Sequence, residues 1–99
     1  MEVENKRVII TGSANGIGSS LSRVFKERNV ESMILVDLDE SNNTKLSNEV
    51  GGIPYKANVG SEGDIIKLVE FAKQEMGGID IFCSNAGISG AGGLLNTSN

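Results

Sequence analysis

Between an apolar run and an amphipathic stretch, the chain carries the sequence Thr11-Gly12-Ser13-Ala14-Asn15-Gly16-Ile17-Gly18. The run before it, Arg7 to Thr11, has the length and β-branched composition of a buried strand. After it, Ile17, Leu21, Val24 and Phe25 recur at the spacing of one helix face. A glycine-rich turn from a strand into a helix presents backbone N–H groups and the positive end of the helix dipole to an anion. We therefore predict a phosphate-binding loop here.

The spacing of this loop is G-x-x-x-G-x-G, which separates it from two other phosphate loops. A G-x-G-x-x-G loop would need glycine at Ala14, and a Walker loop would need Lys and then Ser or Thr where Ser19-Ser20 stand. Hydrolysis of ATP or GTP is therefore not expected. The predicted ligand-binding positions of the loop are Gly12, Ser13, Asn15, Gly16, Ile17 and Gly18. A glycine-rich turn that binds nothing is the alternative.

The rest of the chain alternates strand-like and helix-like segments. Further strands are predicted over 33–37, 52–57 and 79–84, and Pro54 suits an edge strand. Helices are predicted over 40–50 and over a stretch that Ser61 and Asp64 would cap and Gly77-Gly78 would end. The order β-α-β-α-β-α-β predicts an α/β fold with a doubly wound parallel sheet and right-handed crossovers.

Asp37 is predicted to end the second strand, about 20 residues beyond the loop. A carboxylate at that position can accept hydrogen bonds from the adenosine ribose of a dinucleotide. Its charge would repel a 2′-phosphate, and neither the loop nor Leu38-Asp39 offers a Lys or Arg to attract one. The residues therefore predict NAD as the cofactor, preferred over NADP. A solvated strand-end carboxylate is the alternative for Asp37.

The composition excludes several other chemistries. The chain has no histidine and one cysteine, Cys83, so a His/Cys zinc cluster, a Ser-His-Asp or Cys-His pair and an intrachain disulfide are not expected, and no metal site is predicted. We expect Cys83 to be a buried strand residue. A net charge of −4 argues against nucleic acid or an anionic membrane as a partner. The charged start and the short run Val8-Ile9-Ile10 predict no signal or membrane span and a cytoplasmic protein.

Taken together, these residues resemble the short-chain dehydrogenase/reductase family in its non-extended branch. The family loop T-G-x-x-x-G-x-G matches at Thr11 to Gly18, and the family segment N-N-A-G appears as Ser84-Asn85-Ala86-Gly87, with serine replacing the first asparagine. The resemblance implies that Asn85, Ala86 and Gly87 lie beside the cofactor ribose. It also implies that Asn58-Val59, where the family usually has Asp-Val, contact the adenine. Leu38 is assigned to the cofactor site with Asp37.

The family carries out catalysis with a serine and a Tyr-x-x-x-Lys pair, which this chain lacks. Its single tyrosine, Tyr55, is followed four residues later by Val59, so no catalytic residue is predicted in the chain. We interpret residues 1–99 as the N-terminal dinucleotide-binding part of a single Rossmann domain, with the first four strands in the order 3-2-1-4 of a larger sheet and the C-terminal catalytic part absent.

The resemblance implies a longer parent enzyme that transfers hydride between NAD(H) and a small-molecule alcohol or carbonyl substrate, works as a homo-oligomer, and is inactive when reduced to these residues. Two alternatives stay open: a non-catalytic dinucleotide-binding module or partner subunit, and an interaction piece without a ligand. The order 3-2-1-4 argues against a complete module, because the apolar fourth strand would then be an exposed sheet edge.

Overall fold

The computed structural model of the chain describes residues 3–85. Strands and helices alternate throughout this region, as the sequence predicts. The elements are β1 (Arg7–Thr11), α1 (Gly16–Glu27), β2 (Ser32–Val36), α2 (Glu40–Val50), β3 (Ile53–Tyr55), α3 (Glu62–Met76) and β4 (Ile81–Ser84).

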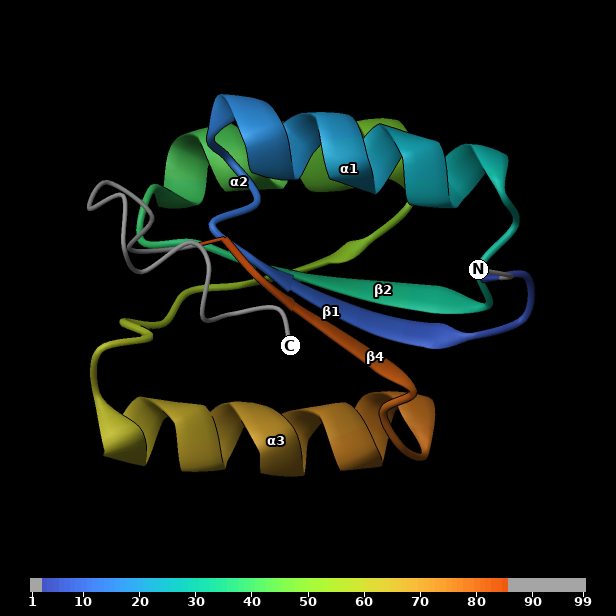
Figure 1. Cartoon of the computed structure of the whole chain (residues 1–99). Helices are drawn as coiled ribbons and strands as arrows, with labels where there is room; N and C mark the ends of the chain where they lie inside the picture. The colour runs from blue at the N-terminus through green and yellow to red at the C-terminus, as the bar shows by residue number, and fades with distance from the viewer. Residues whose placement is uncertain (1–2, 86–99) are drawn as a thin grey trace.

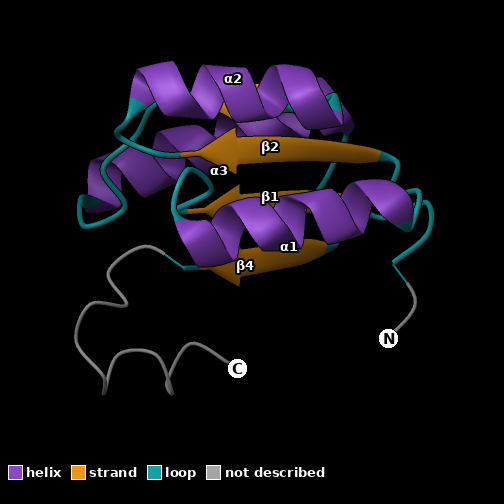
Figure 2. Ribbon diagram, turned by 90° about the horizontal axis from the view of Figure 1, so that it is seen from above, coloured by secondary structure: helices purple, strands orange, loops and turns teal. Residues whose placement is uncertain are grey.

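The four strands form one parallel sheet in the order β3-β2-β1-β4. Helices α1 and α2 cover one face of the sheet and α3 covers the other (Figures 1 and 2). The predicted doubly wound α/β fold and its 3-2-1-4 strand order are therefore confirmed. Pro54 lies in the edge strand β3, where a missing backbone donor is tolerated.

Strand β1 has the predicted bounds and β2 is shifted by one residue, whereas β3 and β4 are shorter than the sequence predicts. Strand β2 ends at Val36, which places Asp37 just beyond the sheet, and β4 begins at Ile81 instead of 79. At the start of β4 the side chain of Asp80 turns to Arg7 and accepts hydrogen bonds from its backbone N (2.9 Å) and its Nε (2.9 Å). This pairing lowers the pKa of Asp80 to about 2.

The central strands are buried on both faces, so their side chains alternate between two cores. Val8 and Ile10 join Met33 and Leu35 under α1 and α2, whereas Ile9 points to the α3 side. Leu68, Ala72 and Met76 supply the α3 side of that second core. The continuous apolarity of β1 and β2 follows from this two-sided burial.

Helix α1 presents a different face to the sheet from the predicted one. Phe25 is buried, but Ile17 is 62% exposed and Val24 is 43% exposed. The buried positions are Gly18, Ser22 and Phe25. The reason is steric: a Cβ on Gly18 would lie 2.1 Å from the carbonyl oxygen of Gly12, so only glycine lets the helix approach the preceding loop this closely.

The ends of the other two helices follow familiar capping chemistry. Asp39 caps α2 by accepting from Asn42 N (3.2 Å), and α2 ends at Gly51 in a left-handed conformation. Ser61 caps α3 by accepting from Asp64 N (3.3 Å), and α3 ends at Gly77, also left-handed. The predicted cap and stop of α3 are thus confirmed.

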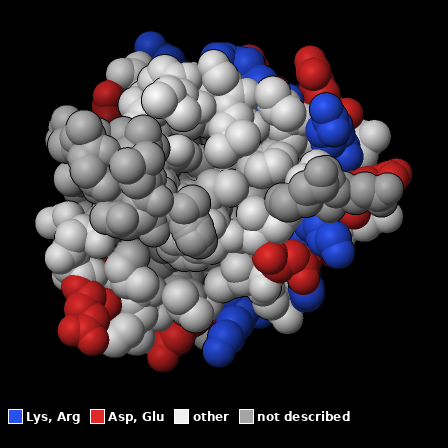
Figure 3. Space-filling model, viewed as in Figure 1, with Lys and Arg blue, Asp and Glu red and all other residues white. Residues whose placement is uncertain are grey.

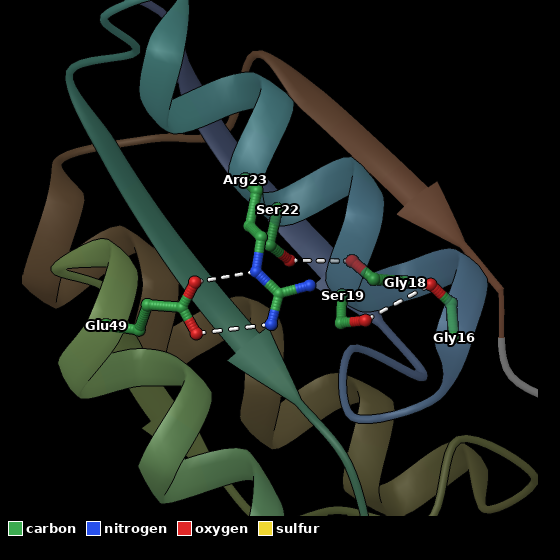
Figure 4. Close-up of polar contacts among 6 residues, drawn as sticks. All are labelled: Gly16, Gly18, Ser19, Ser22, Arg23 and Glu49. Atoms are coloured by element: carbon green, nitrogen blue, oxygen red, sulfur yellow. Dashed lines mark hydrogen bonds and ion pairs between the residues drawn. The ribbon is translucent and has the colours of Figure 1, made fainter.

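Helices α1 and α2 are also linked on their outer side. Arg23 donates from Nε and from the Nη2 nitrogen to the two carboxylate oxygens of Glu49, at 2.6 and 3.1 Å (Figure 4). The guanidinium lowers the pKa of Glu49. Within the described part of the chain, no helix has both the length and the apolarity to cross a lipid bilayer.

Candidate functional site: the loop after β1 and the cavity beside it

The glycines of the loop after β1 have three different roles. Gly12 adopts φ +67°, a conformation that residues with a side chain rarely take, so it makes the turn. Gly18 allows the close contact with Gly12 described above. A Cβ on Gly16 would meet nothing within 4 Å, so no described protein atom requires glycine there. Open space at Gly16 is what the approach of a ligand to the backbone requires.

The N-terminus of α1 offers backbone donors to an anion. Asn15 caps the helix by accepting from Gly18 N at 2.7 Å. Among the described residues, the N–H groups of Gly16 and Ile17 have no recorded hydrogen-bond acceptor. The first turn holds no acidic residue that would oppose an incoming anion. These two donors, together with the helix dipole, fit a phosphate group.

Asp37 stands directly beside this loop. Its Oδ2 accepts from Ala14 N at 2.9 Å, and its Oδ1 accepts from Asp39 N at 2.9 Å. The backbone N of Asp37 donates to Tyr55 O (3.2 Å), which continues the β2–β3 pairing by one residue. The carboxylate is therefore held at the carboxyl end of the sheet by contacts from the loop and from the start of α2.

The loop after β3 carries the next predicted positions. Asn58 N donates to Asp64 Oδ2 (2.8 Å), and Asn58 Oδ1 accepts from Gly60 N (2.9 Å). Asn58 is exposed and Val59 is partly buried. The side chain of Asn58 thus shapes a turn, while the residue itself remains accessible from the cavity described next.

A cavity of about 640 Å³ lies at the carboxyl ends of the strands. In Figure 1 the strands run toward these ends from right to left. This volume is within the range of cofactor pockets. Six of the predicted site residues line it: Gly12, Asn15, Asp37, Leu38, Asn58 and Val59. The described lining residues beyond the prediction are Thr11, Val36, Ala57, Gly60, Ile65, Phe82 and Ser84.

The other predicted positions are distributed differently. Ser13 is a loop residue with a buried side chain, and Gly16, Ile17 and Gly18 form the start of α1 beside the cavity. Asn85 follows β4, where its N donates to Thr11 Oγ1 (3.1 Å). Its buried Nδ2 has no acceptor among the described residues. Ala86 and Gly87 lie outside the described residues.

The described residues that line the cavity carry no positive charge, since none of them is Lys or Arg. Lys56 instead lines a smaller neighbouring hollow of about 70 Å³ together with Asp37 and Glu40. On the face shown in Figure 3, acidic and basic side chains are interspersed.

Cys83 lies in β4, as expected, but it is only partly buried, because β4 is at an edge of the described sheet. Burial raises the pKa of its thiol. Between residues 3 and 85, no three His, Cys, Asp or Glu side chains gather closely enough to hold a metal ion.

Sequence reasoning missed two polar residues that shape the site. Thr11 donates from Oγ1 to Cys83 O (3.3 Å) and so links β1 to β4 at the cavity. Asn43, on α2, is 2% exposed and contacts Ser13. The position of Thr11 at the end of β1 could have indicated that it contacts the site. For Asn43 the sequence gives no such indication, because it is a polar residue in a helix that is polar throughout.

A parallel sheet with a glycine-rich loop, a strand-end acid and a cavity at its carboxyl edge defines a dinucleotide-binding protein of the Rossmann class. The short chain dehydrogenase family model matches residues 6–99, and the chain belongs to this family.

Relatives of known name agree with this assignment. Zerumbone synthase of Zingiber zerumbet is 35% identical over 94 residues, which cover 91% of this chain and 35% of the relative. The 3-oxoacyl-[acyl-carrier-protein] reductase FabG of Thermotoga maritima is 34% identical over 94 residues, which cover 90% of this chain and 38% of the relative. The chain thus spans little more than a third of the length of these relatives.

Solved structures show the same fold. A short chain dehydrogenase/reductase from Burkholderia phymatum in complex with NAD matches with a TM-score of 0.78 and 18% identity, over 83% of this chain and 31% of that one. A 3-ketoacyl-(acyl-carrier-protein) reductase from Brucella melitensis complexed with NADH matches with a TM-score of 0.76 and 27% identity, over 81% and 34%.

Proposed function

We propose that this chain is the NAD-binding part of an oxidoreductase that transfers hydride between NAD(H) and a small alcohol or carbonyl substrate. The observation that carries the proposal is the placement of Asp37. Its carboxylate lies 2.9 Å from the backbone N of Ala14 in the phosphate loop and lines the cavity. One short region therefore combines an anion-binding helix end with an acceptor for ribose hydroxyls.

Each part of the cofactor has a matching set of groups. The N–H groups of Gly16 and Ile17 would hold the pyrophosphate, and Asp37 would accept from the adenosine ribose. Leu38, Asn58 and Val59 would enclose the adenine, since all three line the cavity. Asn85, whose buried Nδ2 has no acceptor among residues 3–85, precedes Ala86 and Gly87, and we assign all three to the nicotinamide side.

The bound cofactor would supply the hydride donor or acceptor, and the residues of this chain would bind and orient it. The catalytic serine and the Tyr-x-x-x-Lys pair of the family would come from a longer polypeptide. We therefore expect the 99-residue chain to bind cofactor without turnover. The cytoplasmic location and the homo-oligomeric parent remain part of the same proposal.

The preference for NAD over NADP rests on charge. A 2′-phosphate would have to lie against the Asp37 carboxylate, and the described cavity lining offers no cation to offset it. Lys56 is the nearest competing feature, because it shares the small adjoining hollow with Asp37. Glu40 lines that hollow as well, and Lys56 is not among the described residues that line the larger cavity.

The test is a pair of calorimetric titrations of the chain with NAD and with NADP, with circular dichroism as a check that the chain is folded. We expect NAD to bind at least about tenfold more tightly, a difference of about 1.4 kcal/mol. A Lys56→Ala variant serves as the control and should leave the ratio unchanged. A folded chain that binds neither nucleotide would overturn the proposal, and equal affinities would overturn the NAD preference.

A further inference from the structure

The phosphate loop rests on a buried polar contact from α2. Ser13 is fully buried and Asn43 is 2% exposed. Ser13 Oγ lies 2.5 Å from Asn43 Oδ1, and Asn43 Nδ2 donates to Leu35 O at 2.8 Å. The contact spans three elements, since Ser13 belongs to the loop, Asn43 to α2 and Leu35 to β2.

The direction of these hydrogen bonds follows from the inventory of donors. The amide nitrogen is the donor of the Asn43 side chain, and it faces the Leu35 carbonyl, which can only accept. Asn43 Oδ1 must therefore face Ser13. The Ser13 hydroxyl has one proton and gives it to this oxygen, which is nearer than the alternative acceptor Val36 O at 3.2 Å.

A second contact holds the next loop residue. Ala14 N donates to Asp37 Oδ2, and the other oxygen of Asp37 accepts from Asp39 N, just before α2. Residues 13 and 14 are thus both anchored to the end of β2 and the start of α2. The two unpaired N–H groups of Gly16 and Ile17 follow only two to four positions later.

We propose that Asn43 is a positioning residue for the phosphate loop, which it holds through Ser13 so that the N–H groups of Gly16 and Ile17 stay aimed at the pyrophosphate. The inference rests on the proposed cofactor function and deepens it. Asn43 does not line the cavity, so it acts through Ser13 and not by touching the cofactor.

The chemistry of asparagine accounts for its place. Asparagine is a weak helix former, and burying its amide without partners is unfavourable. Here both ends of the amide are paired, one with the sheet and one with the loop. Alanine at position 43 would remove the shorter of the two contacts of the Ser13 hydroxyl and would leave the Leu35 carbonyl without the amide donor. At Ser13 the loop would then keep only its contacts with Val36 O, so it would be less restrained.

The test compares Asn43→Ala with Asn48→Ala, which changes an exposed asparagine of the same helix. Titration with NADH, followed by its fluorescence, should give about a tenfold higher Kd for Asn43→Ala, equal to about 1.4 kcal/mol, and no change for Asn48→Ala. Competition with adenosine, which has no phosphate, should be the same for both variants. A general loss of folded protein would weaken both ligands together, so unequal effects separate positioning from destabilisation.

A double-mutant cycle identifies the route of the effect. Ser13→Ala removes the same hydrogen bond from the loop side and should weaken NADH binding to a similar degree. The double variant should then be little weaker than either single one. Additive effects would mean that Asn43 does not act through Ser13. If Asn43→Ala does not fold, Ser13→Ala alone decides, and unchanged NADH affinity in that variant overturns the inference.

Amide hydrogen exchange in the free chain gives a readout that needs no cofactor. Exchange at Gly18, whose N–H is bonded to Asn15, should be at least several-fold faster in Asn43→Ala than in Asn48→Ala, because the loop is less restrained. Unchanged exchange overturns the inference. Failure of the parent chain to bind NADH would overturn only the proposed function, since the exchange experiment is independent of it.

Discussion

Two glycines of the phosphate loop, Gly16 and Gly18, should respond to alanine in opposite ways. At Gly18 the new Cβ would lie 2.1 Å from Gly12 O and 2.8 Å from Gly12 C and Ser13 Cα. All three are backbone atoms, and an ordinary contact between such atoms is about 3.5 Å. The loop would therefore have to move by more than 1 Å to relieve the clash at Gly12 O. We expect a loss of about 3 kcal/mol or more in the free energy of unfolding, at the upper end of the range for overpacked sites.

At Gly16 the same change meets nothing within 4 Å, and the residue begins α1 with ordinary helical geometry. Alanine should therefore raise the free energy of unfolding by about 0.5 to 1 kcal/mol, because it restricts the unfolded chain and favours the helix. The methyl group would nevertheless occupy the space where we propose that the pyrophosphate approaches. NADH affinity should fall at least about tenfold.

The assays are urea unfolding followed by circular dichroism and NADH titration of each variant. The two variants should differ in opposite directions. Gly18→Ala should lose stability, whereas Gly16→Ala should gain stability and lose affinity for NADH. A Gly16→Ala chain that binds NADH like the parent would refute the placement of the cofactor at this helix end. A Gly18→Ala chain of unchanged stability would refute the packing argument.

Three further predictions concern Asp37, Asp80 and Ser61. Asp37→Ala should lower the ratio of NAD to NADP affinity, and a ratio equal to that of the parent in parallel titrations would contradict its assignment. The pKa of Asp80 is lowered to about 2 from 3.8, so the ion pair with Arg7 contributes stability that is present above about pH 4 and lost as the pH falls toward 2. When the free energy of unfolding is measured against pH, Asp80→Asn should therefore lose less stability than the parent over that window. An equal loss in the two chains would count against the ion pair. Ser61→Ala removes the cap on α3 and should cost about 1 kcal/mol in urea unfolding, with Ser20→Ala, on the exposed side of α1, as the control.

The fold was predictable because its signals are local and repeated. Two-sided burial makes β1 and β2 continuously apolar, and the caps at Ser61 and Gly77 depend on residues close to them in sequence. The alternation of elements then restricts the topology, since parallel strands joined by right-handed crossovers leave few arrangements. These features need no knowledge of distant contacts.

The face of α1 could not be predicted in this way. Ile17 and Val24 match the apolar period of a helix, yet both are exposed. The contact that orients α1 joins Gly18 to Gly12, and glycines add nothing to a hydrophobic pattern. The role of Asn43 could not be predicted for a related reason. Its partner Ser13 is 30 positions away, and nothing in the local sequence distinguishes a buried asparagine from a solvent-exposed one.

The structure also changes what Asp37 is expected to do. The sequence predicts that Asp37 acts on the adenosine ribose alone, by accepting from its hydroxyls and by repelling a 2′-phosphate. In the fold each carboxylate oxygen already accepts one backbone N–H, from Ala14 and from Asp39. Each oxygen has a second lone pair, so both contacts can persist while ribose hydroxyls bind.

The same carboxylate would therefore position the loop and select the cofactor, and the two roles should be lost together. If Asp37 acted on the ribose alone, its replacement by alanine would mainly improve binding of NADP. Because Ala14 N would also lose its acceptor, we expect Asp37→Ala to weaken binding of NAD and of pyrophosphate-containing fragments such as ADP as well. An Asp37→Ala chain that binds ADP as tightly as the parent would separate the two roles and confine Asp37 to selectivity.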